Sequence, residues 1–252
     1  MYLTRIKKSL KKILVTKGNE HFGNCNYGKF VVITRSRTGS NMLIKLISSH
    51  RSIQAYGELF NQTKDKNCEK IWTHTFSKRL NYVKFVGFKI FYDHPLGSDD
   101  KTVWDFIKSD RSIKIIHLKR ENVIRSQLSL LIAHKTQTWG VTPTMKDTPI
   151  DQKKIAVNIE EFLKDIRKTK LWEKDTALIF SEHPYMEVMY KDIITDKDKT
   201  MEKIFKFLEV PDQKTTSDLR KQNPEEIRDL VYNYNELESA LRNTEFYHLL
   251  KE

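Results

Sequence analysis

The stretch "FVVITRSRTGSNMLIKLI", residues 30–47, predicts the centre of the fold. Its first part, Phe30–Thr34, is a short run rich in β-branched residues, which is typical of a buried strand. Asn41–Ser49 carries its apolar residues at helical spacing, so a helix is expected there. Two arginines, several small hydroxyl residues and a glycine connect these elements. The sequence therefore predicts a strand, a tight polar turn and a helix in direct succession.

This turn has the chemistry of an anion site. The free N–H groups of a first helical turn and the helix dipole attract negative charge. Gly39 allows the backbone to approach a ligand closely, and Arg35 and Arg37 can supply charge and paired hydrogen bonds. The Gly-x-x-x-x-Gly-Lys-[Ser/Thr] loop of nucleotide triphosphate sites is absent, and a capped helix after an ordinary polar turn is the alternative. The other candidate ligand-binding residues of the turn are Ser36, Thr38, Ser40 and Asn41.

A second stretch, "IIHLKRENVIRSQLSL" at residues 115–130, repeats this order. Ile113–Leu118 predicts a strand, and a helical pattern follows the basic turn at once. Arg120 lies in the turn, and Ser126 and Ser129 lie about two helical turns further on. An arginine on the surface, paired with a nearby acid, is the alternative for Arg120 alone. Two such units in one sheet predict a ligand with phosphate groups at both ends.

The rest of the chain alternates strand and helix patterns. This order predicts an α/β fold in which a central parallel sheet is flanked by helices on both faces. A length of 252 residues suits one such domain. The further strands are expected at Phe85–Phe91 and Met186–Tyr190, and the further helices at Ile155–Trp172, at Met201–Leu208 and from Asn223 toward Arg242.

Residues 1–17 differ in charge from the rest of the chain. They hold six Lys or Arg and no acid, which is half of the net charge of +12. We expect an amphipathic helix that packs on the domain with its basic face in water. A helix lying on an anionic membrane surface is the alternative. The chain is accordingly divided into a basic N-terminal helix and loop, residues 1–28, and one domain, residues 29–252.

Composition and pattern exclude several classes of protein. No apolar run is long enough to span a membrane, and no secretory signal is visible. The two cysteines form no metal-ligand pattern, so we expect a cytoplasmic protein, with the inner membrane face as a peripheral site if residues 1–17 bind lipid. The positive charge suits an anionic ligand. We expect no nucleic-acid partner, because no known binding motif appears, and the oligomeric state stays open.

Together these segments resemble the sulfotransferases that use 3′-phosphoadenosine 5′-phosphosulfate (PAPS), most closely the bacterial carbohydrate- and glycolipid-type enzymes. "RSRTGSNML", residues 35–43, is similar to the family's 5′-phosphosulfate loop. "LKRENVIRSQLS", residues 118–129, is similar to its 3′-phosphate strand and helix, and residues 188–211 resemble a later strand–helix. The family's glycine-rich Arg-Lys-Gly segment is missing, with Lys221 as a candidate partial replacement.

The resemblance implies a P-loop-like three-layer fold and in-line sulfuryl transfer from PAPS to an acceptor hydroxyl, on a carbohydrate or a glycolipid. Arg37 would hold the phosphosulfate, with Arg35 as its support or as a direct contact. The backbone of the turn would cradle the 5′-phosphate. Arg120 and Ser129 would bind the 3′-phosphate. No metal ion is expected.

The resemblance also implies a general base. Glu58, in "YGELFN", is the first candidate, and His94, in "KIFYDHP", is its rival. An exposed glutamate and an ordinary loop histidine are the corresponding non-catalytic interpretations. Aromatic side chains that could line an acceptor cleft are Tyr56, Phe60, Trp72, His74 and Trp139, although packing is the more usual role for each.

Two other functions remain compatible with these residues. A catalytically inactive relative could bind PAPS or its product 3′-phosphoadenosine 5′-phosphate (PAP) without transfer. A nucleotide phosphotransferase would share the fold, but it should carry the Gly-Lys-[Ser/Thr] loop and a carboxylate for magnesium. Neither feature is found in the sequence.

Overall fold

The structure, a computed structural model, describes residues 18–19, 21–61, 67–98, 100–140, 145, 148–216 and 223–251. The predicted helix at residues 1–17 and the candidate Lys221 lie outside the described residues.

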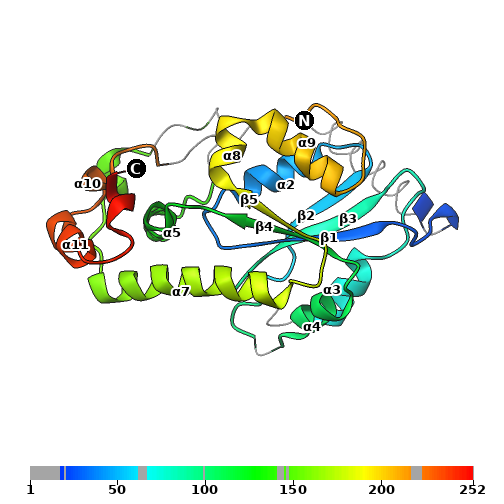
Figure 1. The fold of residues 1–252 in the computed structure, drawn as a ribbon, viewed down its shortest axis with the longest axis horizontal. Coiled ribbons are helices and arrows are strands. Elements are labelled where there is room, and N and C mark those ends of the chain that lie inside the picture. The colour runs from blue at the N-terminus through cyan, green and yellow to red at the C-terminus, as the bar shows by residue number, and fades with distance from the viewer. Residues whose placement is uncertain are drawn as a thin grey trace, which may run out of the picture.

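A five-stranded sheet forms the centre of the protein, and all of its strand pairs are parallel. The strand order is β2-β3-β1-β4-β5. This confirms the predicted α/β class with a central parallel sheet, and the fold is P-loop-like (Figure 1). The strands are β1 Gly28–Thr34, β2 Ile53–Glu58, β3 Phe85–Phe91, β4 Lys114–Lys119 and β5 Tyr185–Met189.

Helices cover both faces of the sheet, as Figure 1 shows, with α2, α8 and α9 on one side and α3, α4 and α7 on the other. Helix α5 lies beyond the end of β4, next to α10 and α11. The helices are α2 Ser40–Ser48, α3 Cys68–Thr75, α4 Thr102–Ser109, α5 Val123–Thr136, α6 Ile150–Lys153, α7 Ile159–Ile179, α8 Tyr190–Thr195, α9 Lys197–Phe207, α10 Ile227–Leu230 and α11 Tyr234–Leu241, followed by the 3₁₀ helix η1 Tyr247–Lys251.

Strand β1 is apolar on both faces because both faces are buried. Phe30 and Val32 join the core cluster shared with α2 and α9, whereas Val31 and Ile33 join the cluster on the side of α4. All four side chains have 0% exposure. A strand buried on both faces reads as a continuous apolar run, which is why residues 30–34 predicted it so clearly.

The sequence did not predict the edge strand β2. Among its residues only Ile53 is buried, and the polar sequence "IQAYGE" has no clear alternation. The sequence analysis also missed the short helices α3 and α4.

The prediction of one helix from Asn223 toward Arg242 was wrong. Two short helices, α10 and α11, lie there instead, because the chain between them pairs with the segment before α7. The N–H of Ile155 donates to the main-chain oxygen of Leu230 at 2.9 Å, and the N–H of Tyr232 donates to that of Ile155 at 2.8 Å. For the same reason α7 begins at Ile159 rather than at residue 155.

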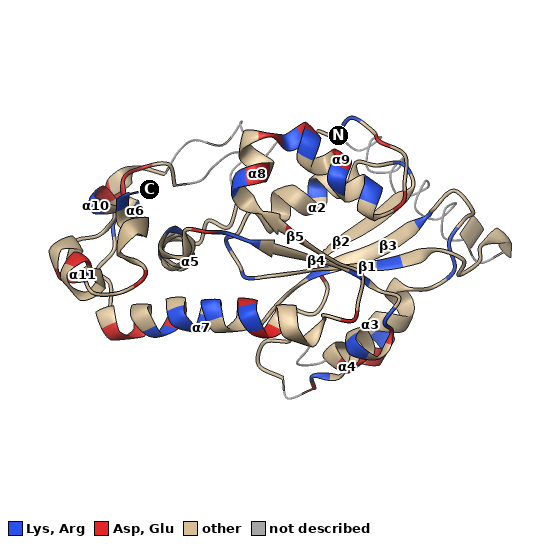
Figure 2. Cartoon of the chain, viewed as in Figure 1, with Lys and Arg blue, Asp and Glu red and all other residues tan. Residues whose placement is uncertain are grey.

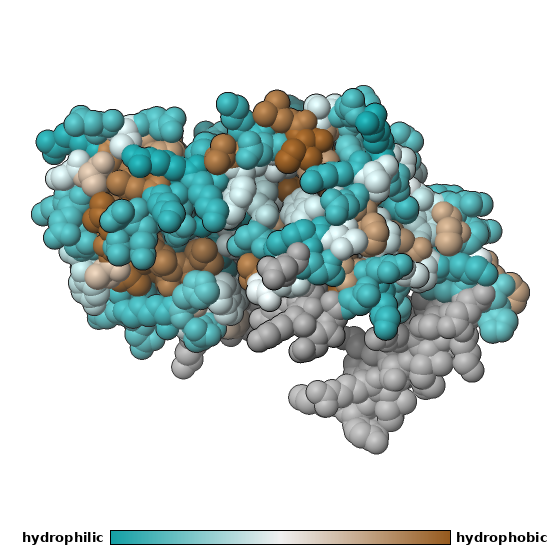
Figure 3. Space-filling view, turned by 90° about the horizontal axis from the view of Figure 1, so that it is seen from below, coloured by the Kyte–Doolittle hydropathy of each residue, from teal (hydrophilic) through white to brown (hydrophobic). Residues whose placement is uncertain are grey.

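The outer surface is mixed in character. Helices α7 and α9 carry both acidic and basic residues (Figure 2). Seen from the side of α7, hydrophilic residues dominate and apolar areas interrupt them (Figure 3). The most exposed large apolar residues of α7 are Leu171, Leu178 and Ile179. None of the helices within the described ranges has the length and apolar content to cross a membrane.

Candidate active site

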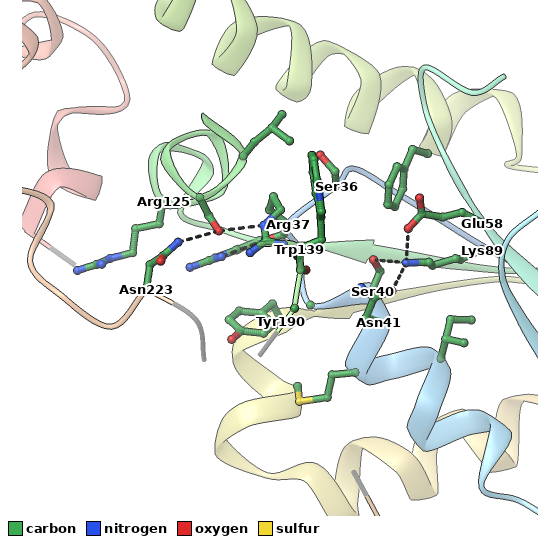
Figure 4. Close-up of a pocket in the computed structure, with 18 of the residues that line it drawn as sticks. Ser36, Arg37, Ser40, Asn41, Glu58, Lys89, Arg125, Trp139, Tyr190 and Asn223 are labelled. Carbon is green, nitrogen blue, oxygen red and sulfur yellow. Dashed lines mark hydrogen bonds and ion pairs between the residues drawn. The ribbon is translucent and has the colours of Figure 1, made fainter. Parts of the chain in front are cut away.

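A cavity of about 1170 Å³ opens at the carboxyl end of the sheet. Parallel strands bring their carboxyl ends to one edge, which is where ligands of open α/β sheets bind. The turn after β1, the end of β3, the first turns of α5 and α8 and the segment 223–230 all contribute to its lining (Figure 4). The two strand–turn–helix units predicted from the sequence therefore meet in one cavity.

Buried hydroxyl groups fix the turn after β1. The hydroxyl of Thr34 donates to the main-chain oxygen of Leu118 on β4 at 2.6 Å. The hydroxyl of Thr38 donates to the main-chain oxygen of Arg35 at 2.8 Å. Thr38 is 4% exposed and does not line the cavity. Its side chain shapes the turn, while its neighbours reach the cavity.

Gly39 gives the turn a conformation that other residues rarely adopt. Its φ is 84°, and a Cβ atom built there would lie 2.4 Å from Cδ2 of Tyr190. Arg37 also has a positive φ, 65°, which is uncommon for a residue with a side chain. Helix α2 begins without a side-chain cap and without an acid in its first turn. Its first N–H groups are therefore available to an anion, and the capped-helix alternative does not apply.

Arg35 points away from the cavity. Its Nη1 donates to the main-chain oxygen of Asp165 at 3.0 Å and to the hydroxyl of Thr169, and its Nη2 donates to Oε1 of Gln127 at 2.6 Å. Burial lowers the pKa of Arg35, and the nearby carboxylate of Asp165 opposes this shift. The guanidinium joins the end of β1 to α5 and α7. Of the two roles considered for Arg35, the geometry favours support of the turn.

Arg37 lines the cavity. Its Nε donates to the hydroxyl of Ser129 at 3.0 Å, and its Nη1 donates to the main-chain oxygen of Trp139 at 2.8 Å. Burial lowers the pKa of Arg37 to about 10, and the positive charge of Arg120 adds to that effect. The group is still protonated at neutral pH, so the turn presents a full positive charge beside Ser36 and Ser40 (Figure 4).

Arg120 and Ser129 reach the same cavity from the second unit. Nη1 of Arg120 donates to the main-chain oxygen of Arg37 at 3.0 Å, and its guanidinium lies 4.9 Å from the ring centre of Tyr190. The hydroxyl of Ser129 also accepts from Nδ2 of Asn223 at 3.2 Å. Ser126 differs: it is 3% exposed, contacts its own helix and does not line the cavity.

Glu58 and Lys89 form an ion pair at the other end of the cavity. Oε1 of Glu58 lies 2.7 Å from Nζ of Lys89, and Lys89 also contacts Oδ1 of Asn41 and, at 3.4 Å, Oγ of Ser40 (Figure 4). Lys89 is 1% exposed. Burial lowers its pKa, and the charge of Glu58 opposes this shift. Lys89 thereby connects the candidate base to the first turn of α2.

The sequence reasoning missed Lys89. A signal was present, because "FVGFKIF" places one lysine inside a strand that is otherwise apolar. A buried charge is costly unless it is paired, so such a lysine indicates a partner or a ligand nearby.

His94, the rival base, also lines the cavity and is 1% exposed. Its ring lies 4.7 Å from that of Phe91. Burial lowers its pKa, although the carboxylates of Asp93 and Glu58 oppose this shift. A neutral imidazole near Glu58 is therefore available. Both Glu58 and His94 thus remain candidates for the general base.

Only Trp139 among the aromatic acceptor candidates lines the cavity, with 46% of its surface exposed. Phe60 and Trp72 pack in or against the core cluster beside α4, as does Tyr56. His74 is exposed on α3. The position of Trp139 matters because its main-chain oxygen holds Arg37.

Among the described residues, no group of three or more His, Cys, Asp or Glu side chains is placed to hold a metal ion.

The sequence profile of the sulfotransferase domain matches residues 28–245. A sulfotransferase structure from Alicyclobacillus acidocaldarius is similar over 88% of this chain and 95% of that chain, with 13% identity and a TM-score of 0.54. Mouse sulfotransferase SULT7A1 in complex with PAP is similar over 94% of this chain and 92% of that chain, with 13% identity and a TM-score of 0.51. No curated protein matches the sequence.

Proposed function

This chain belongs to the sulfotransferase family, and we propose that it transfers the sulfuryl group of PAPS to a hydroxyl of a carbohydrate or glycolipid acceptor. The observation that carries this proposal is the meeting of Arg37 and Arg120, from two separate strand–turn–helix units, in one cavity that ends at Glu58. This arrangement suits a ligand that carries two phosphate groups. The reacting group of that ligand would lie between its phosphates and the candidate base.

Each unit would hold one end of the nucleotide. The backbone N–H groups at the start of α2 and the guanidinium of Arg37 would bind the 5′-phosphosulfate. Arg120 and Ser129 would bind the 3′-phosphate. Arg35 would act indirectly, because its hydrogen bonds hold the turn against α5 and α7.

The chemical step would be an in-line displacement at sulfur. The acceptor oxygen forms a bond to sulfur while the bond from sulfur to the bridging phosphate oxygen breaks, and PAP leaves with the electron pair. Arg37 and Lys89 would neutralise the charge that develops on the transferring group. Glu58 would take the acceptor proton, with His94 as the other candidate. The ion pair with Lys89 holds the carboxylate of Glu58 at the cavity wall.

The acceptor would enter beside Trp139 and Leu96. Both line the cavity and are unusually exposed for their type, 46% and 43%. The N–H of Leu96 bonds to the main-chain oxygen of Asn61, and the side chain of Asn61 donates to Glu58 at 3.1 Å, which puts Leu96 near the candidate base. An apolar surface beside a polar reacting end suits a sugar ring or a glycolipid.

A transfer assay with labelled PAPS and a panel of sugars, alkyl glycosides and glycolipids tests this function. We expect label in at least one carbohydrate-bearing acceptor, with one PAP formed for each sulfate transferred. Tight binding of PAP together with no transfer to any member of the panel would favour the inactive relative. Stabilisation by ATP and magnesium, but not by PAP, would favour the phosphotransferase.

A further inference from the structure

The far end of the cavity, beyond Ser129, holds a further arginine that the proposed roles do not use. Arg125 lies in the first turn of α5 and lines the cavity (Figure 4). Its Nη1 donates to the main-chain oxygen of Glu225 at 2.9 Å. Its Nε is buried and has no hydrogen-bond partner, and no carboxylate in the described part of the chain forms an ion pair with it. Within the described ranges its charge thus has no ion-pair partner beside the cavity.

Arg125 extends a row of like charges. Burial lowers the pKa of Arg120. Tyr190 opposes this shift, whereas the positive charge of Arg125 lowers the pKa further. The positive charge of Arg120 likewise lowers the pKa of Arg37. Arg120 thus lies between two like charges, and this repulsion destabilises the free protein. A multiply charged anion between them would remove that cost.

Neutral groups at this end complete the set of donors. Asn223, which precedes α10, donates through Nδ2 to the hydroxyl of Ser129 at 3.2 Å, while its Oδ1 is buried without a partner. Glu225, whose main-chain oxygen accepts from Arg125, has its Oε1 2.6 Å from Nζ of Lys153, so a second cation offsets its charge. Two guanidinium groups and the hydroxyl of Ser129, which Asn223 holds in place, offer donors to the oxygens of a phosphate monoester.

We propose that Arg125 acts with Arg120 as a two-arginine clamp on the 3′-phosphate of the nucleotide. Arg125 then sets the preference for a 3′,5′-bisphosphate over a 5′-monophosphate. In this clamp a guanidinium N–H of Arg125 donates to a phosphate oxygen. This inference rests on the proposed function and adds a specificity-determining residue to it.

Calorimetric titration with PAP and with 5′-AMP tests the clamp. We expect the wild type to bind PAP about 100-fold more tightly than 5′-AMP, because the 3′-phosphate adds charged hydrogen bonds to the clamp. Arg125→Gln should weaken PAP binding about tenfold and leave 5′-AMP binding within twofold of the wild type. The PAP affinity of Arg125→Lys should lie between those of the wild type and Arg125→Gln. The matched control is Arg228→Gln, on α10, whose side chain is exposed outside the cavity.

Three results would overturn the clamp. An equal loss of affinity for both nucleotides, together with a lower melting temperature of the ligand-free variant, would mean that Arg125 acts only on the fold. A wild type that prefers PAP and an Arg125→Gln variant that keeps the full preference would remove Arg125 but leave the proposed function intact. A wild type without preference for PAP would contradict both.

Discussion

The two units that meet in the cavity, β1–α2 and β4–α5, present different kinds of donor to an anion. Helix α2 begins behind Gly39 without a side-chain cap, so its backbone N–H groups are available. Helix α5 begins behind Asn122, whose side chain accepts from the N–H of Arg125 at 2.8 Å. The second unit must therefore meet its ligand with side chains, those of Arg120 and Ser129.

This difference decides what each unit tolerates. A backbone cradle depends on its conformation and is little affected by loss of one side chain, because the N–H groups remain. A side-chain clamp tolerates small backbone shifts but loses a large share of its binding with each group removed. The first unit should be sensitive to strain and the second to truncation.

Glu58 belongs to neither unit, so its substitution should separate chemistry from binding. Glu58→Gln removes the proton acceptor and keeps the shape, and we expect turnover to fall by about 10²–10⁴-fold. The affinity for PAP should stay within twofold, measured by calorimetry beside the transfer assay. Glu69→Gln, an exposed acid on α3, serves as the control. Unchanged turnover would remove Glu58 as the base and favour His94.

A methyl group at Gly39 should break the backbone cradle. In Gly39→Ala the new Cβ meets the ring of Tyr190 and the positive φ becomes strained. We expect roughly 100-fold weaker PAP binding, since strain of about 1–3 kcal/mol acts directly on the donors. Gly57→Ala is the control, because a Cβ there has no atom within 4 Å. Equal effects of the two substitutions would contradict the cradle.

Truncation of Arg37 and of Arg120 should show which of the two units loses more PAP affinity without its arginine. Arg120→Ala removes a main donor of the clamp, and we expect about 30-fold weaker PAP binding. Arg37→Ala leaves the backbone donors in place, so PAP binding should weaken about tenfold while turnover falls further. Titrations of both variants measure the ranking. A larger binding loss for Arg37→Ala would show that the first unit also depends on its side chain.

The smallest expected change in PAP binding distinguishes two serines of α5, Ser129 and Ser126. Ser129→Ala removes a hydroxyl that lines the cavity and accepts from Arg37 and Asn223, and PAP binding should weaken about fivefold. Ser126→Ala should leave binding unchanged, because that hydroxyl contacts only its own helix in the described structure. Equal losses in the two titrations would contradict the assignment.

The central fold was predictable because burial on both faces leaves a strong mark in the sequence. Strand β3 lies where Phe85–Phe91 predicted it, and all seven of its residues are buried. Edge strand β2 leaves no such mark, since most of its side chains are only half-buried. Its absence from the prediction also hid the position of Glu58, which is the last residue of that strand.

The motifs of the site were predictable from the sequence, but the separate roles of their residues were not. Arg35 and Arg37 look equivalent in the sequence, yet one binds Asp165 and Gln127 and the other lines the cavity. That separation depends on contacts with residues about 90 and 130 positions away. The pairing of Lys89 with Glu58 likewise depends on the neighbouring registers of β2 and β3.

The central claim is that the two units form one site for a nucleotide with two phosphate positions. A thermal-shift titration of the wild-type protein with PAP, beside 5′-AMP and ATP, tests it most directly. We predict a concentration-dependent rise in melting temperature with PAP alone, of roughly 5–10 °C at 100 times its dissociation constant. No rise at millimolar PAP, or an equal rise with 5′-AMP or ATP, would contradict the claim.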